Sequence, residues 1–306
     1  MPMTMKRYTT FNEELRRRFG CRVQRLSLDA GFTCPNRDGS LASGGCTFCG
    51  DRGAAAVGVP IELPLKQQLQ KSKDYLVRKF RAEKFLAYFQ AYSNTYGPVD
   101  LLRRQYAEAL AEPDMIGLII GTRPDCLPDE VLKLLAELNQ QTYLWLELGM
   151  QTMHDQTLAA VNRGHTHACF VDAVKCCQEF GIRICAHLIL GLPGENREQM
   201  LASVKELNRL GVDGIKLHHL HVLKGSRLEQ EYTNGRLSLM ERDEYVELVC
   251  DALELLDPQI LIHRLMGDGR SELIAPDWSR RKLEVLNQID AELKKRNSRQ
   301  GSRLFG

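Results

Sequence analysis

The distribution of apolar positions predicts a chain built from repeated strand and helix units. Six short apolar runs, rich in β-branched and aromatic residues, have the length of strands. They are nearly continuous in apolar character, as expected of parallel strands that are buried on both faces. These runs occupy residues 23–28, 85–91, 116–121, 143–149, 182–190 and 214–222.

Longer amphipathic segments separate these runs and predict helices. They cover residues 65–80, 99–111, 128–138, 167–180 and 197–210. Each is long enough to form a right-handed crossover between two parallel strands. The pattern therefore predicts an α/β fold, a partial (βα)6 barrel of the TIM type, with its functional residues at the carboxyl ends of the strands.

The alternation of strands and helices stops after residue 222. Helical patterns follow near residues 241–256 and 280–295, and one apolar run lies between them at 260–265. We interpret this part as a helical C-terminal extension packed on the barrel. The expected division is a helical lead-in over residues 1–20, the barrel over 21–224 and the extension over 225–306.

The composition fits a globular protein with a substantial core, because 43% of the 306 residues are hydrophobic and 26% are charged. No apolar stretch has the length of a membrane span, and residues 1–7 lack the apolar segment of a signal peptide. We therefore expect a cytoplasmic protein with no membrane partner. In that reducing compartment the ten cysteines predict metal binding or packing, and no disulfide framework.

The net charge of +2 creates no global field that would attract nucleic acid, but basic residues cluster locally. Between Trp278 and Gly306 there are eight basic and three acidic side chains, a net charge of +5. Arg16, Arg17 and Arg18 form a second cluster. These clusters are either phosphate contacts or solvated helix faces.

Three cysteines follow the first predicted strand in one loop: Cys34, Cys46 and Cys49. A Cys-x-x-Cys pair lets two thiolates face one metal centre, and Gly44-Gly45 lets the backbone wrap closely around it. Three thiolates leave one iron of a four-iron cluster with an open site. The alternatives are a zinc site completed by a histidine, which would give a non-catalytic binding module, and a thioredoxin-like redox pair.

This loop resembles the cluster loop of radical S-adenosylmethionine (SAM) proteins related to the Elongator catalytic subunit and the oxygen-independent coproporphyrinogen oxidases. It is most similar to that of the YhcC/YtqA family, which includes Gram-positive MnmL-type tRNA wobble-uridine modification enzymes. Eleven residues separate Cys34 from Cys46, whereas three is the usual number, and the Elongator-like branch shares a lengthened spacing. The resemblance runs from about Lys6 to beyond Trp278. It implies a [4Fe-4S] cluster held by the three cysteines, with SAM on the fourth iron.

The same resemblance implies a SAM site at the ends of later strands. Residues 88–95 resemble the segment that meets the methionine amino group, and residues 191–195, Gly-Leu-Pro-Gly-Glu, resemble the adenine-side motif. Gln151 and Arg163 match the spacing of a glutamine and an arginine that contact the SAM ribose and carboxylate. The implied cofactor-binding set is Phe48, Gln90, Thr95, Glu147, Gln151, Arg163, His187, Ile189, Gly191, Pro193, Glu195 and Leu220.

Some of these residues also have ordinary structural interpretations. Residues 88–95 could form a polar turn, residues 191–195 a helix-entry turn, and Arg163 a helix cap or surface contact. The pattern leaves the roles of four histidines open between substrate contact, proton relay and a polar rim. These histidines are His218, His219, His221 and His263.

The resemblance implies that one electron cleaves SAM to methionine and a 5′-deoxyadenosyl radical, which removes a hydrogen atom from an unreactive carbon. The implied partners are a tRNA substrate and a one-electron donor such as flavodoxin or ferredoxin. The expected step converts 5-carboxymethylaminomethyl-uridine at the wobble position towards 5-aminomethyl-uridine. The alternative is a radical SAM enzyme acting on a small molecule such as a porphyrinogen or a nucleoside.

Overall fold

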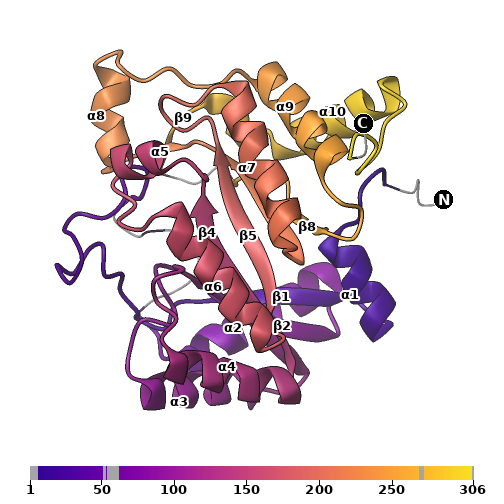
Figure 1. Ribbon diagram of the computed structural model, residues 1–306. Coiled ribbons are helices and arrows are strands. Elements are labelled where there is room, and N and C mark those ends of the chain that lie inside the picture. The colour runs from indigo at the N-terminus through magenta and orange to yellow at the C-terminus, as the bar shows by residue number, and fades with distance from the viewer. Residues whose placement is uncertain (1–5, 51–52, 54–61, 269–271, 305–306) are drawn as a thin grey trace.

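The computed structural model describes residues 6–50, 53, 62–268 and 272–304, and its centre is one curled parallel sheet (Figure 1). The strand order is β1-β2-β3-β4-β5-β6-β8, and every neighbouring pair is parallel. The strands are β1 (Val23–Leu28), β2 (Lys84–Phe89), β3 (Met115–Thr122), β4 (Tyr143–Gln151), β5 (Arg183–Leu190), β6 (Gly214–His219) and β8 (Leu261–Arg264).

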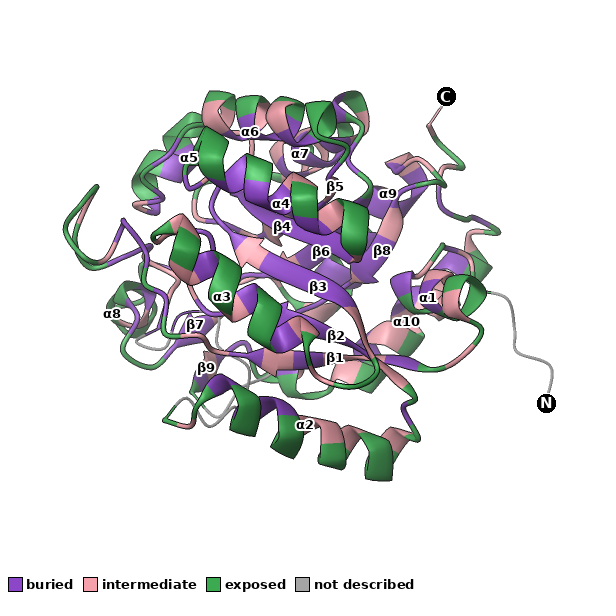
Figure 2. Cartoon of the chain, turned by 90° about the horizontal axis from the view of Figure 1, so that it is seen from below, coloured by how far each residue is buried: buried purple, intermediate pink, exposed green. Residues whose placement is uncertain are grey.

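Helices connect successive strands and cover the outer face of the sheet. They are α2 (Leu65–Phe80), α3 (Val99–Leu110), α4 (Asp129–Gln141), α6 (His167–Glu179) and α7 (Arg197–Leu210), with the short α5 (Asp155–Ala160) after β4. Figure 2 shows their buried residues facing the sheet and their exposed residues facing away. This is the arrangement that the amphipathic periods predict.

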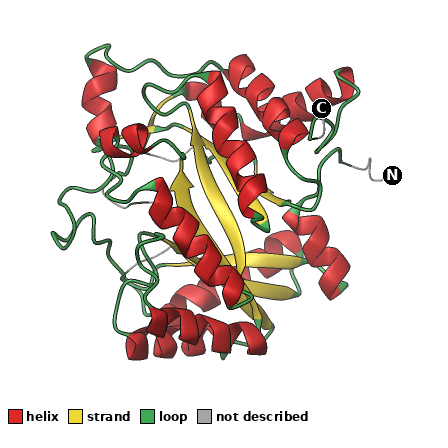
Figure 3. Cartoon of the chain, viewed as in Figure 1, coloured by secondary structure: helices red, strands yellow, loops and turns green. Residues whose placement is uncertain are grey.

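The predicted fold class is confirmed, and the extension contributes one more strand than expected. The apolar run at 260–265 forms β8, which pairs with β6 and extends the half-barrel to seven strands. The rest of the extension is mainly helical, as Figure 3 shows. It contains α8 (Arg227–Thr233), α9 (Arg242–Leu255), β9 (Leu273–Ala275), a 3-10 turn (Asp277–Arg280) and α10 (Lys282–Lys295), and β9 pairs with the short β7 (Val222–Leu223), which lies just before the expected boundary. The boundaries at 20/21 and 224/225 stay a prediction.

Helix α1 (Phe11–Phe19) closes the amino-terminal end of the half-barrel. Thr10 caps it in a reciprocal capping box with Glu13, and Gly20 ends it in the left-handed conformation. Its buried Phe11 and Leu15 pack against side chains near the strand starts, among them Tyr143. Because α1 covers this end, ligands reach the inner face from the carboxyl ends of the strands.

The inner face of the half-barrel changes from apolar to polar along the strands. Trp145 on β4 and Cys185 on β5 belong to the apolar cluster beside α1. Two residues further along each strand, on the same face, stand Glu147 and His187. The inner surface of the sheet therefore carries polar side chains, and the apolar cluster beside α1 closes this surface at the amino-terminal ends of the strands. None of the described helices has the length and apolar character that a membrane span requires.

Candidate active site

The loop after β1 folds back on itself and brings its three cysteines to one cavity. The Arg37 amide donates to the Cys34 carbonyl at 2.8 Å, and the Cys49 amide donates to the Cys46 carbonyl at 3.0 Å. Cys34 and Cys46 therefore each begin a tight turn. Gly44 and Gly45 have φ of 79° and 73°, a region that favours glycine. Cys34 and Cys46 are buried, Cys49 is half-buried, and all three line a cavity of about 140 Å³.

The cavity stabilises negative charge on the Cys46 sulfur, while the hydrogen bond to Cys46 raises the pKa of the Cys49 thiol. The Cys49 thiol donates a hydrogen bond to Cys46 and, together with the Arg163 guanidinium, holds the pKa of Cys46 well below its usual range. Arg163 Nη1 lies 3.6 Å from Cys46 Sγ. Asn36 Nδ2 also lies 3.6 Å from this sulfur. Since the thiolate is the form that ligates iron, these surroundings fit a thiolate-bound cluster.

The remaining cysteines have the surroundings of packed side chains. Burial raises the pKa of Cys177 and of Cys250 to about 12 in each case, so both thiols stay protonated at neutral pH. Cys185 is buried beside Glu147 and His263, and these three side chains could together ligate a cation. The Lys216 ammonium, 2.5 Å from Glu147 Oε2, already supplies a positive charge there. The structure therefore favours the loop after β1 as the metal site.

Two arginines form the cationic wall of the cysteine cavity. Arg163 is only 6% exposed and donates from Nη2 to the carbonyl of Gly149 at 2.9 Å. Arg123 donates to the Arg163 carbonyl at 2.8 Å, and its guanidinium also forms two hydrogen bonds to Asp125, at 2.6 and 2.8 Å. The Arg163 guanidinium is thus held firmly beside the cysteines, and its Nε is buried with no hydrogen-bond partner among the described residues.

The end of β4 holds Gln151 against Arg163. Gln151 has a positive φ of 70°, and it lines the cysteine cavity together with Arg163. A Cβ atom at Gly149 would lie 2.5 Å from Gln151 Nε2 and 2.6 Å from Arg163 Nη2. A larger residue at position 149 would therefore displace the ends of both side chains, which are the two residues predicted to contact SAM.

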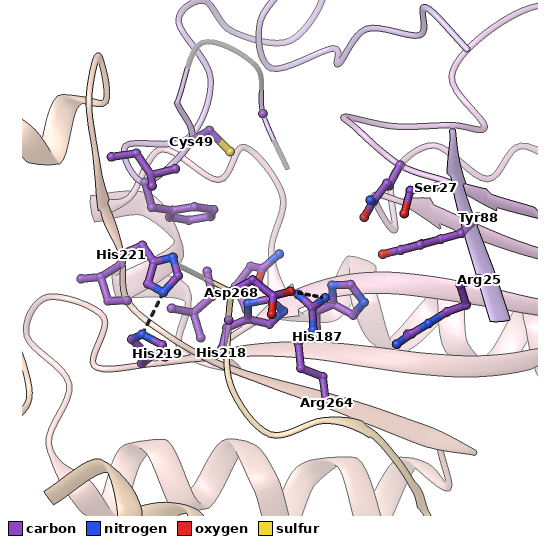
Figure 4. Close-up of a pocket in the computed structure, with 18 of the residues that line it drawn as sticks. Arg25, Ser27, Cys49, Tyr88, His187, His218, His219, His221, Arg264 and Asp268 are labelled. Atoms are coloured by element: carbon purple, nitrogen blue, oxygen red, sulfur yellow. Dashed lines mark hydrogen bonds and ion pairs between the residues drawn. The ribbon is translucent and has the colours of Figure 1, made fainter. Parts of the chain in front are cut away.

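A second, larger cavity of about 620 Å³ adjoins the first and lies inside the half-barrel (Figure 4). The two cavities share part of their lining, including Phe48, Cys49 and Gln90. The size lies in the range of small-molecule sites. A molecule in the larger cavity would therefore lie next to whatever the cysteines hold.

The structure brings most of the predicted cofactor-binding residues to these two cavities. Those that line one or both are Phe48, Gln90, Glu147, Gln151, Arg163, His187, Ile189 and Leu220. Thr95 does not face them, because its hydroxyl pairs with that of Thr122 and donates to the Cys126 carbonyl, both at 2.6 Å. Gly191, Pro193 and Glu195 form the turn before α7 and are not among the lining residues of either cavity.

A buried polar cluster forms one wall of the larger cavity. Glu147 Oε2 accepts from Lys216 at 2.5 Å and from the Tyr88 hydroxyl at 2.7 Å, and lies 3.0 Å from His187 Nε2. Burial acts to raise the pKa of Glu147, but Lys216 and His187 outweigh it and hold that pKa well below its usual range. Burial also lowers the pKa of Lys216, to about 8. The cluster fixes the His187 ring at the cavity.

The four histidines whose roles were open lie in different surroundings. His263 stacks on Phe11 with ring centroids 3.9 Å apart and belongs to the barrel floor. His219 bonds Ser279 and, at 2.8 Å, His221, and burial lowers its pKa to about 2, so it stays neutral. His218 lines the larger cavity 6.0 Å from the ring of His187. Three of these four histidines, His218, His219 and His221, therefore line the larger cavity, whereas His263 does not.

The sequence analysis assigned no role to several polar residues of the larger cavity. Arg25 and Ser27 come from β1, and Asp268 follows β8. The sequence does contain a signal for Arg25 and Ser27, because these polar residues alternate with Leu26 and Leu28, which are buried. A strand with one polar face is typical of a cavity wall.

Comparisons with known proteins agree with this architecture. The sequence matches the Radical SAM superfamily over residues 34–207 and the Radical_SAM C-terminal domain over residues 212–295. The uncharacterized protein YtqA of Bacillus subtilis is 47% identical over 97% of this chain and 93% of its own length.

More distant matches connect the chain to the Elongator-like branch. The tRNA uridine(34) acetyltransferase of Dehalococcoides mccartyi is 30% identical over 52% of this chain and 34% of its own length. The structure of archaeal Elp3 from Methanocaldococcus infernus superposes with a TM-score of 0.68 at 15% identity, over 91% of this chain and 64% of that one. The fold, the match over more than half the chain and the full-length similarity lead to one conclusion: the chain belongs to the radical SAM superfamily, whose cofactors are a [4Fe-4S] cluster and SAM, and within it to the family of YtqA and YhcC.

Proposed function

We propose that Cys34, Cys46 and Cys49 hold the [4Fe-4S] cluster and that SAM binds beside it. The observation that supports this most directly is the convergence of three thiols from one loop on a single cavity with a cationic wall. When bound, the cluster and SAM supply a 5′-deoxyadenosyl radical, which removes a hydrogen atom from a substrate carbon. The chain binds and orients these groups and keeps water away from them.

Different residues around the cysteines would contact different parts of SAM. The planar guanidinium of Arg163 can form two hydrogen bonds to a carboxylate, and the Gln151 amide can form a hydrogen bond to a hydroxyl group. Phe48, Ile189 and Leu220 supply apolar walls on the side of the larger cavity. Together these residues would hold SAM beside the larger cavity, where the substrate would bind.

Replacing Arg163 with alanine tests this assignment of the SAM site. We expect SAM affinity to fall by about 10- to 100-fold, since a charge-assisted hydrogen bond contributes roughly 1.5–3 kcal/mol. Iron content should stay at the wild-type value because no ligand of the cluster is removed. Equilibrium binding of SAM to reconstituted proteins measures the effect. Unchanged SAM affinity would exclude Arg163 from the SAM site.

We infer that the substrate is tRNA, modified at the wobble uridine, with the electron supplied by a donor such as flavodoxin or ferredoxin. The similarity to a tRNA uridine(34) acetyltransferase supports this substrate. The reaction would convert 5-carboxymethylaminomethyl-uridine to 5-aminomethyl-uridine. A C–H bond of the methylene group between the amine and the carboxylate would break, the carbon radical would pass one electron to a one-electron acceptor such as oxidised flavodoxin or ferredoxin, and water would hydrolyse the resulting imine. The two carbons leave as glyoxylate.

The structure changes which basic residues we expect to contact tRNA. Arg16 and Arg18 lie on α1, at the end of the barrel opposite to the cavities. In the C-terminal segment, Arg296 pairs with Asp251, Glu254 and Glu292 and fastens α10 to α9. We therefore expect these charges to contribute less to phosphate binding than the sequence suggests.

Other basic side chains lie close to the cysteine loop. The exposed Arg227 donates from Nη2 to the Ser43 carbonyl at 3.2 Å, and Lys224 is exposed nearby, next to Gly50. A nucleotide entering the larger cavity would bring its phosphates to this side of the molecule. Lys224 and Arg227 are thus the better candidates for phosphate contacts.

Binding of unmodified and modified tRNA at several salt concentrations tests the substrate assignment. We expect affinity to fall steeply with salt, and the double variant Lys224→Gln, Arg227→Gln to bind more weakly with a slope smaller by about one to two. The variant Arg16→Gln, Arg18→Gln is the matched control and should bind as wild type does. If wild-type protein binds no tRNA at low salt, the tRNA assignment is wrong.

A further inference from the structure

Arg25 presents an unpaired positive charge to the larger cavity. It extends from the inner face of β1, and its Nη1 is buried with no hydrogen-bond partner in the described part of the chain. No ion pair to Arg25 occurs among the described residues either. A buried charge without a partner is costly, so a retained one points to a counter-charge that arrives with a ligand.

The acidic residues of this region already have cationic partners. Glu147 pairs with Lys216 at 2.5 Å, and both are almost fully buried. Asp268 Oδ2 pairs with Arg264 at 3.0 Å, and its other oxygen bonds the Lys282 ammonium. The described structure thus has four cations around this end of the cavity, Arg25, Lys216, Arg264 and Lys282, for the two carboxylates, and Arg25 is the cation that forms no ion pair with either.

Arg25 and Arg264 line the same cavity, although they belong to strands at opposite edges of the sheet. Arg25 belongs to the first strand and Arg264 to the last, and the curl of the sheet brings both to one cavity, as Figure 4 shows. Both guanidinium groups act on the pKa values of Tyr88 and Lys216, so both lie within electrostatic reach of these two residues. The rings of His187 and His218 also line this space, and burial lowers the pKa of each, so they add no positive charge at neutral pH.

We propose that Arg25, with Arg264 beside it, binds a carboxylate of the substrate in the larger cavity. This inference rests on the proposed function, because the 5-carboxymethylaminomethyl group ends in a carboxylate. A guanidinium fork matches a carboxylate with two parallel hydrogen bonds. Anchoring that carboxylate would fix the neighbouring methylene group inside the cavity that Cys49 and Phe48 also line. Arg25 is thus a specificity-determining residue that selects the carboxylate-bearing nucleoside.

Two anticodon stem-loops of the same sequence test the proposal, one with 5-carboxymethylaminomethyl-uridine and one with 5-methylaminomethyl-uridine, which lacks the carboxylate. We expect wild-type protein to bind the first about 10- to 100-fold more tightly. Arg25→Gln should lose this preference, with unchanged affinity for the carboxylate-free RNA. Iron content and SAM affinity should stay at wild-type values, which shows that the variant folds. Arg22→Gln, at an exposed position just before β1, is the matched control and should keep the preference.

The outcomes separate this inference from the proposed function. If Arg25→Gln keeps the full preference, Arg25 is not the carboxylate site. If wild-type protein binds both RNAs equally, the carboxylate inference fails while the tRNA assignment stands. If wild-type protein binds neither RNA, the tRNA assignment fails and this inference fails with it.

Discussion

Replacing Cys46 with alanine is expected to reduce the iron bound after anaerobic reconstitution from about four atoms per chain to background. The Cys49 thiol and the Arg163 guanidinium hold the pKa of Cys46 well below its usual range, and Asn36 Nδ2 also lies close to the Cys46 sulfur. A cluster held by three cysteines does not survive with two. Iron and sulfide analysis of the purified chain measures the effect, and Cys34→Ala and Cys49→Ala should behave in the same way.

Cys176→Ala is the matched control for this experiment. Cys176 is half-buried on α6 and lies outside both cavities. Its replacement should leave about four iron atoms per chain. Full iron content in any one of the three loop variants would remove that cysteine from the cluster site, and zinc without iron in wild-type protein would favour the zinc-stabilised binding module.

Replacing Glu147 with glutamine is expected to lower the free energy of unfolding by about 3–5 kcal/mol. The substitution removes the negative charge that faces Lys216 in a region where both side chains are at most 1% exposed. It also removes the charged acceptor of the Tyr88 hydroxyl. Urea unfolding of wild-type and variant proteins with the same iron content measures the loss.

A second variant separates the charge effect from a packing effect. Glu147→Gln combined with Lys216→Met removes both charges, and we expect it to recover most of the lost stability because no buried charge is left alone. A loss below about 1 kcal/mol in the single variant would show that water or another group compensates Lys216, and would contradict the described cluster.

The sequence predicted the fold well because its strongest signals are local. Most of the six expected strands are nearly continuous apolar runs, and the crossover helices have an amphipathic period, so burial dictates both. The role of residues 260–265 was harder to predict. An apolar run of this length fits a strand or a buried segment equally well, and its pairing with β6 depends on the closure of the whole sheet.

The part of the candidate site that lies in a single loop could be predicted from the sequence. Cys34, Cys46 and Cys49 lie within sixteen residues, so their spacing alone suggested a shared centre. Gln151 and Arg163 came from the resemblance, and the structure places the ends of both side chains close to Gly149. Thr95 shows the limit of such transfer, because its position in a motif could not reveal that its hydroxyl is engaged by Thr122.

Pairings that depend on long-range contacts could not be predicted from the sequence. Arg25 and Arg264 are 239 positions apart, and only the curled sheet brings them to one cavity. The same holds for Lys216, whose partner Glu147 stands two strands away. A charged residue in a predicted strand is a useful signal, but its partner is fixed by tertiary structure.

The most direct test of the account is the formation of 5′-deoxyadenosine by the anaerobically reconstituted protein with SAM and a strong one-electron reductant, with and without tRNA. We predict that wild-type protein forms 5′-deoxyadenosine in at least one of these conditions and that Cys46→Ala forms none. Equal amounts from wild-type protein and Cys46→Ala, or none from iron-loaded wild-type protein in either condition, would contradict the account.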